Sequence, residues 1–181
     1  MEPVTPDAPP AIAVVRDFVN TTDRETGVDE IASQAELTRW LVARDLMPRA
    51  SRATAADHEA AFRLRAGLRR ALEVNHDGGP AALPELAAVL ADQPVSLTWT
   101  TEGAALTTEA AGIRGALARI AIAAHTATTD GTWPRLKICS WDECEWAYYD
   151  HSKNRSRHWC EYGCGNKVKT RAYRARKAAT R

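Results

Sequence analysis

The chain has 181 residues, of which 45% are hydrophobic and 26% charged, a composition that is ordinary for a globular protein and excludes a largely disordered one. It holds no uncharged run near the roughly 20 residues of a transmembrane helix, and its proline-rich start lacks the pattern of a secretory signal. We therefore expect a cytoplasmic protein without membrane association, in which the cysteines do not form disulfides.

The net charge of +1 conceals an asymmetry along the chain. Residues 1–134 hold 12 Arg, no Lys and 18 Asp or Glu, a net charge of −6, whereas residues 135–181 hold 12 Lys or Arg and 5 Asp or Glu, a net charge of +7. All four cysteines also lie in the second part. We predict a disordered lead (1–10), a front domain (11–134) and a cysteine-bearing tail (135–181) that binds a polyanion.

The first patterned segment of the front, residues 11–23, begins apolar and ends polar. Its apolar run fits either a short strand or the start of a helix, because so short a run has no decisive period. The polar cluster that follows it contains Asn20, Thr21 and Asp23. These residues are typical of a turn and a helix cap, and the alternative hypothesis is that they bind a ligand of the front domain.

Apolar residues at helical spacing, preceded by capping residues or proline, predict helices that begin near Ser33, Thr54, Pro84 and Ile113. The period changes over residues 95–100, where apolar and polar residues alternate as in a strand, and residues 104–108 can return as its partner. The front is therefore predicted to be mainly α-helical with one small β-hairpin.

Motifs that carry catalysis are weak in the front. His58, His76 and His125 are isolated, and the sequence contains no phosphate loop, GxSxG or HExxH motif. An enzyme in the front domain, acting on a small molecule, is therefore only an alternative hypothesis. We expect a protein that is not an enzyme.

The tail carries two close cysteine pairs. Four residues separate Cys139 from Cys144, three separate Cys160 from Cys164, and fifteen lie between the pairs. This spacing is typical of one structural zinc ion held by four thiolates, a closed site that leaves no position for catalytic water. Free cysteines, two disulfides or an iron–sulfur cluster are less favoured alternatives, as is replacement of one cysteine ligand by His151 or His158.

The segment between the pairs predicts a β-hairpin. Residues 146–149 alternate as in a strand, residues 150–154 fit a turn, and residues 155–159 return toward the second pair. A hairpin between two cysteine loops, the second of which opens a helix, is a treble-clef-like arrangement. The helix N-terminus would then stabilise the negative charge of a zinc ion with four thiolates.

A basic helix is predicted from Val168 onward. Seven Lys or Arg lie in residues 167–181 without an acid, and Lys167, Arg171 and Arg174 share one side. A thin apolar side, mostly alanine, is expected to dock on the hairpin while the basic side faces outward. Such a helix fits phosphate binding, since Lys and Arg displace the counterions of nucleic acids. The alternative is a solvated, frayed tail.

These residues resemble a known bacterial family, the CGNR zinc-finger proteins, whose front is the ABATE domain and which are described as candidate stress-induced transcription regulators. The resemblance rests on the cysteine pairs, on WAYYD, on Asp150-His-Ser-Lys-Asn154, on Arg157-His158-Trp159-Cys160 and on Cys164-Gly165-Asn166-Lys167. The front motifs DFVNTTD and Leu37–Leu41 are also similar to the family's pattern. The resemblance covers nearly the whole chain.

Three positions depart from the family pattern. Lys167 stands in place of the arginine that gives the family its name, Lys153 replaces another arginine, and His158 replaces a third. Charge survives at the two lysines, but the planar two-pronged contact of arginine is lost. We therefore expect these lysines to bind phosphate.

The resemblance and the basic tail together predict a DNA-binding transcription regulator, with DNA favoured over RNA through the resemblance. The front domain would bind an unidentified small-molecule effector or a protein, and a homodimer would fit the pairing of DNA half-sites. The alternative is a protein-interaction module that uses zinc as a structural staple. The residues predicted to contact nucleic acid are Lys153, Arg155, Arg157, Lys167, Lys169, Arg171 and Arg174.

Overall fold

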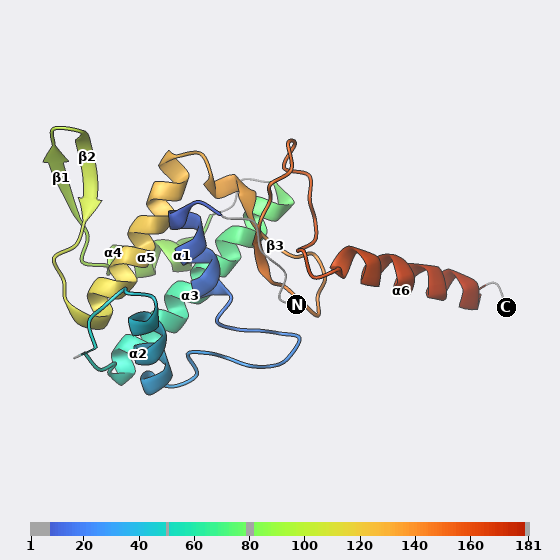
Figure 1. Cartoon of the computed structure of the whole chain (residues 1–181), viewed down its shortest axis with the longest axis horizontal. Coiled ribbons are helices and arrows are strands. Elements are labelled where there is room, and N and C mark those ends of the chain that lie inside the picture. Colours follow the sequence, from blue (N-terminus) through green and yellow to red (C-terminus); the bar gives the residue numbers. More distant parts are fainter. Residues whose placement is uncertain (1–7, 50, 79–81, 180–181) are drawn as a thin grey trace.

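A computed structural model of the chain describes residues 8–49, 51–78 and 82–179. The elements are, in chain order, α1 (Pro10–Val19), α2 (Gln34–Ala43), α3 (Ala55–Asp77), α4 (Pro84–Ala91), β1 (Ser96–Thr100), β2 (Gly103–Thr107), α5 (Gly112–Thr129), the 3-10 helix η1 (Trp133–Arg135), β3 (Leu136–Ile138), β4 (Ala147–Tyr149) and α6 (Cys164–Ala179) (Figure 1). The predicted fold class, mainly α with a small hairpin and a cysteine-bearing tail that ends in a helix, is confirmed.

The first segment is a helix. Residues 1–7 of the predicted disordered lead lie outside the described residues, and Pro10, its last residue, begins α1. Ile12, Val15 and Val19 of α1 are buried, as is Phe18, so the apolar side chains follow a helical face. The strand alternative for this run is therefore wrong.

The helix starts follow the capping residues of the sequence. The Ser33 hydroxyl accepts the backbone N–H of Glu36 at 3.2 Å, and Thr54 forms a reciprocal capping box with Asp57 at the start of α3. Proline is the first residue of α4. Helix α3 ends at Asp77 and is followed by Gly78, whose φ of 76° is a left-handed conformation that glycine adopts without strain.

One hydrophobic core joins the front to the tail. Its members come from the helices of the front and from both strands of the tail, which contribute Leu136, Ile138 and Ala147. Strand β3 packs against α3, and β4 packs against α1. The tail is therefore built onto the helical body by its own strands.

The strand pairing in the tail differs from the prediction. β4 pairs antiparallel with β3, which precedes the first cysteine pair, and Leu136 lies opposite Tyr149. Residues 155–159, predicted as the return strand, have no strand assignment. The difference arises because Leu136 and Ile138 are apolar and enter the core, whereas the segment 153–157 carries three cations.

Helix α6 projects away from the body (Figure 1). It begins at Cys164, earlier than predicted. Every residue from Lys169 to Ala178 is exposed, so the expected docking of Ala172 and Ala175 on the hairpin is wrong. Alanine side chains bury little apolar surface, and this stripe is too thin to hold the helix against the rest of the tail.

No helix among the described residues is long and apolar enough to cross a membrane.

Candidate metal centre and nucleic-acid interface

The four cysteines converge at the base of α6. Cys139 follows β3, Cys144 precedes β4, Cys160 lies in the following loop, and Cys164 is the first residue of α6. All four are buried, and their Sγ atoms lie within 4.8 Å of one another. Elements distant in sequence thus place four sulfur atoms around one point.

The sulfur positions fit a zinc ion. The Sγ atom of Cys160 lies 3.4 Å from that of Cys164 and 3.7 Å from that of Cys144. A tetrahedron with Zn–S bonds of about 2.3 Å has edges of about 3.8 Å, close to both distances. Both separations are far longer than the roughly 2.05 Å of a disulfide. The donor set is four soft thiolates without an oxygen, the chemistry of a closed structural zinc site.

The thiol pKa values reflect how closely the four sulfurs lie together. Hydrogen bonds from Cys144 and Cys160 lower the pKa of Cys139 to about 2, whereas the hydrogen bond to Cys139 raises the pKa of Cys144 to about 12. Hydrogen bonds to the same sulfurs raise the pKa of Cys160, and burial raises that of Cys164. A metal ion among the four sulfurs would balance the negative charge of their thiolates.

The histidine alternatives do not join the cysteine cluster. Within the described residues, the cluster consists of the four cysteines alone. The Nδ1 atom of His158 lies 3.3 Å from Nε2 of His76 in α3, and the His151 ring packs edge-on against Tyr149. The four cysteines predicted as ligands thus lie together in one cluster, and the two histidines lie outside it.

A buried ion pair holds the loop between the cysteine pairs. The Lys137 ammonium donates to Asp150 Oδ2 at 3.0 Å and to the backbone carbonyls of Arg155 and Arg157. Burial raises the pKa of Asp150, but hydrogen bonds from Ser152, Lys137 and the Arg157 N–H outweigh burial and lower it to about 2. The charged pair therefore fixes the shape of residues 150–157.

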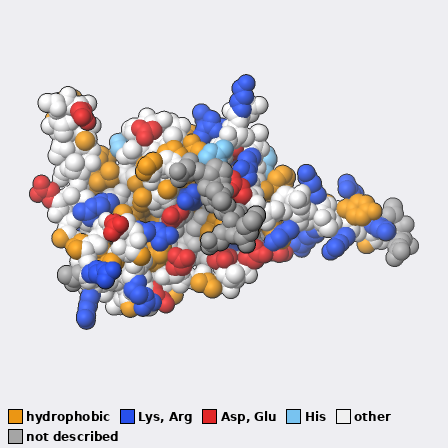
Figure 2. Space-filling model, viewed as in Figure 1, with side chains coloured by type: hydrophobic (Ala, Val, Ile, Leu, Met, Phe, Trp, Pro, Cys, Tyr) orange, Lys and Arg blue, Asp and Glu red, His pale blue; other side chains and the backbone are white. Residues whose placement is uncertain are grey.

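The predicted nucleic-acid contacts lie on two neighbouring segments of the tail. Lys153 and Arg155 are exposed on the loop held by Lys137, whereas Arg157 is half-buried and pairs with Glu161 at 3.0 Å. Along α6 the Lys and Arg side chains extend over much of the projecting helix (Figure 2). The exposed predicted residues of this helix are Lys167, Lys169, Arg171 and Arg174.

Two of these helix residues have acidic partners. Lys167 pairs with Glu25 of the front at 2.8 Å and its ammonium lies 4.2 Å from the Trp141 ring centre, while Arg171 pairs with Glu143 at 3.0 Å. The tail sequence 167–181 lacks acids, so these partners come from elsewhere in the chain. The first turns of α6 are thus tied to two loops. One is the loop after α1 in the front, which contains Glu25, and the other is the first cysteine loop, which joins Cys139 to Cys144 and contains Glu143.

The front residues predicted as ligand contacts are engaged within the protein. The Asn20 amide donates to the Ala147 carbonyl at 2.9 Å and accepts the Ala147 N–H at 2.7 Å, which joins α1 to β4. Asp23 accepts the N–H groups of Glu25 and Thr26, as in a turn. The turn interpretation therefore accounts for Asp23, and Asn20 acts as a clamp.

Thr21 belongs to a buried polar group that sequence reasoning missed. Arg65 of α3 donates to the Thr21 hydroxyl at 2.8 Å and to both carboxylate oxygens of Asp29. Burial raises the pKa of Asp29, but the hydrogen bonds from Arg65, the Ile31 N–H and Thr22, together with the charge of Arg65, outweigh burial and hold the pKa below its usual value. A second arginine, Arg69, donates to the carbonyls of Val19 and Glu145 and so also joins the front to the tail.

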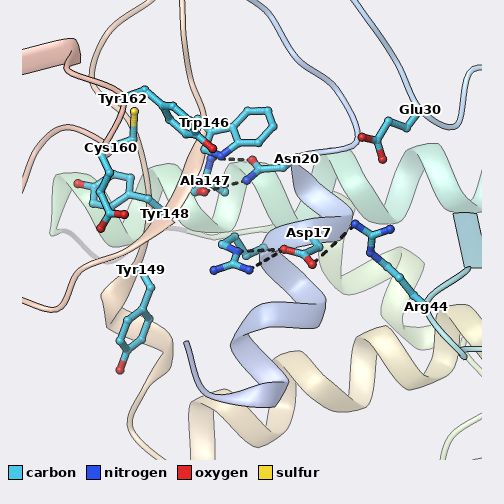
Figure 3. A pocket seen from close by; sticks show the side chains of 12 residues that line it. Asp17, Asn20, Glu30, Arg44, Trp146, Ala147, Tyr148, Tyr149, Cys160 and Tyr162 are labelled. Carbon is cyan, nitrogen blue, oxygen red and sulfur yellow. Dashed lines mark hydrogen bonds and ion pairs between the residues drawn. The ribbon is translucent and has the colours of Figure 1, made fainter. Parts of the chain in front are cut away.

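A pocket, which we call the seam pocket, lies between the front and the tail (Figure 3). Its volume is about 170 Å³. Asn20, Asp17 and Arg44 line it from the front, whereas Trp146 and Tyr162 line it from the tail. Any molecule that fills this pocket would therefore touch both parts of the chain.

Four clustered cysteines form a metal site, and the last of them begins an exposed basic helix. This unit is packed against a helical body, and the arrangement defines a zinc-finger protein. Residues 135–177 match the family model of the CGNR zinc finger. Residues 13–131 match the ABATE family, described as "Putative stress-induced transcription regulator". The chain belongs to the ABATE family and carries a CGNR zinc finger with one site for zinc. We found no match among curated proteins.

The two family matches describe the function of the chain in general terms. The recognised resemblance is confirmed in both its parts and in their order along the chain. The descriptions are those of a transcription regulator and of a zinc finger, and neither describes an enzyme.

Proposed function

We propose that the chain is a DNA-binding transcription regulator whose zinc finger presents α6 to the DNA backbone. The observation that carries this proposal is the exposure of α6. Every residue of α6 from Lys169 to Ala178 is exposed, so this stretch gains little from burial, on which most helices in proteins depend. Contact with phosphates would stabilise both the helix and its charges.

The loop of residues 150–157 supports the same surface. It brings Lys153 and Arg155 into solvent, and the Lys137–Asp150 pair fixes its backbone. Binding to a preformed loop loses less conformational entropy than binding to a mobile one. A zinc-fixed helix with a rigid basic loop therefore suits a phosphate backbone better than a frayed tail would.

The test is a salt titration of binding to mixed-sequence duplex DNA. Replacing Lys169→Ala and Arg171→Ala together should weaken binding to all sequences and flatten the slope of log K against log salt by about 1.8, since each lost phosphate contact removes about 0.9. The matched control replaces Arg52→Ala and Arg63→Ala, two exposed arginines of the front, and should leave the slope unchanged.

Other outcomes would favour the alternatives. Absence of binding at low salt would contradict the proposal and favour a zinc-stapled module that binds an acidic protein surface. An equal loss of slope in both double variants would mean that net charge, and not α6, governs binding.

We further propose that a small-molecule effector of the regulator binds in the seam pocket. The supporting observation is that Trp146 and Tyr162 of the finger and Asp17 of the front line the same space. An effector there would contact β4 and the segment 160–162 of the finger, and also α1 and Asn20, which binds β4. Compounds that raise the melting temperature of the protein but not of a Tyr162→Ala variant would support this site. Equal stabilisation of both proteins would contradict it.

A further inference from the structure

The β1–β2 hairpin leaves apolar side chains in solvent at the far end of the molecule from α6 (Figure 1). Leu97 is 70% exposed and Trp99 82% exposed. Leu106 lies opposite Leu97 in the register and Ala104 lies opposite Trp99, so these four side chains share one face. A two-stranded hairpin is marginally stable alone in water, and this one has little cover from the body.

The outer edge of β1 is open for pairing. A two-residue turn joins Thr100 to Gly103, and such turns close on a hydrogen-bonded pair. Because hydrogen bonding alternates along an antiparallel strand, the backbone groups of Leu97 and Trp99 point away from β2. In the described residues β2 is the partner of β1, and all five β1 residues are exposed.

The exposed edge of β1 also lacks the features by which proteins prevent edge strands from pairing with one another. Natural proteins protect such strands with lysine, proline, inward charges or bulges. The strand Ser96–Thr100 contains no charged residue and no proline, and its ladder with β2 runs without a break. An exposed edge of this kind is expected to pair.

We propose that the β1 edge pairs with the same edge of a second copy, to give a four-stranded antiparallel sheet across a two-fold axis at Thr98. In this register Leu97 lies opposite Trp99 of the second copy, and Ser96 lies opposite Thr100. Apolar residues therefore meet apolar residues on one face, and hydroxyl groups meet on the other. The outward backbone groups of Leu97 and Trp99 form hydrogen bonds with each other across the axis.

The charge distribution favours a second copy over a charged partner. The strand Ser96–Thr100 carries no charge, and the two-fold register places it against the same uncharged strand of the second copy. The hairpin also lies far from α6, so association through β1 leaves the basic helix uncovered. The inference does not depend on DNA binding.

The first test is sedimentation equilibrium of the zinc-loaded full chain at rising concentration. The mass should increase from 19.8 kDa toward twice that value. Trp99→Lys, which places a cation at the paired edge, should abolish the increase. Thr107→Lys, the same charge on exposed β2, should leave it intact. A wild-type protein that stays monomeric, or equal loss in both variants, would overturn the proposal.

The second test reads the register. Across the proposed axis Thr98 faces its own copy as a non-hydrogen-bonded pair, with Cα atoms about 4.5 Å apart, which suits a disulfide. Thr98→Cys should therefore form a covalent dimer under mild oxidation. Thr100→Cys, whose copies would lie roughly 14 Å apart at 3.4 Å per residue, should not. Equal cross-linking of both variants would refute the register, and circular dichroism confirms that each variant is folded.

Discussion

The front and the finger are stabilised by different interactions. The front buries large aliphatic and aromatic side chains from several helices, among them Phe18, Leu64, Leu68 and Leu117. Outside its strands, the finger instead packs Trp141, Trp146 and Trp159 around the four cysteines. A metal ion with its ligands thus replaces the apolar core that so short a segment cannot build.

The boundary between the two modes of stabilisation does not coincide with the boundary between the two family matches. Leu136, Ile138 and Ala147 belong to the finger in sequence but to the front core in space. We infer that the finger has an inner part that depends on apolar packing and an outer part that depends on zinc. The variants below separate these parts.

The largest effect is expected from loss of the metal. Cys160→Ser, or a chelator, should unfold residues 139–146 and 150–164, because zinc binding contributes on the order of 10–16 kcal/mol in small zinc modules. Strands β3 and β4 should remain, since Leu136 and Ala147 are held in the front core. Hydrogen exchange checks both expectations.

Zinc added back after chelation should restore protection in the wild-type chain but not in the variant. A near-native finger without metal would contradict the inference that its outer part depends on zinc. Loss of protection in β3 and β4 together with the loops would contradict the inference that its inner part is held by apolar packing.

The next largest effect is expected at the buried ion pair. Lys137→Met would leave Asp150 charged and without its partner, and breaking a buried pair in this way costs about 3–5 kcal/mol. Exchange should rise in residues 150–157, which Lys137 holds through two carbonyls, while the front keeps its protection. The control Lys153→Met removes an exposed lysine of the same loop and should change stability little.

Sequence reasoning succeeded where a structural feature depends on local spacing. The cysteine pairs, the caps at Ser33 and Thr54 and the proline that begins α4 are patterns within a few residues, and the structure confirms them. Each pattern specifies its own geometry, because a cap or a ligand loop closes on neighbouring backbone groups.

It failed where partners lie far apart in the chain. Asn20 binds Ala147 across 127 positions, and the sequence shows only a polar residue after an apolar run. Arg65 lies within a leucine repeat and Lys137 between two apolar residues, and a buried cation at such a position is the signal that could have pointed to an internal carboxylate. The projection of α6 was missed because amphipathic spacing indicates a face, not whether that face finds a partner.

A smaller effect is expected at the Asn20 clamp. Asn20→Ala would leave the buried N–H and C=O of Ala147 without partners, at a cost of about 1–3 kcal/mol each. The melting temperature should fall and β4 should exchange faster, although zinc stays bound. Thr128→Ala, which removes an exposed hydroxyl that bonds a backbone carbonyl within α5, serves as the control and should cost much less. Loss of zinc from the Asn20 variant would show that the inner and outer parts of the finger are not separable.

The smallest effect concerns the acids that pair with α6, and it rests on the proposed DNA binding. Glu25→Gln and Glu143→Gln together should release Lys167 and Arg171 for phosphates and steepen the salt slope. The gain in affinity should stay below about tenfold, since exposed ion pairs contribute little. The control pair Glu59→Gln and Glu109→Gln makes the same charge change on the front surface. If affinity for DNA rises only in the Glu25/Glu143 variant, these acids compete with DNA for the cations of α6. If it rises equally in both double variants, the acids act only through the net charge of the protein. The two single variants then extend the comparison of front and finger, because Glu25 belongs to the front and Glu143 to the finger's first cysteine loop.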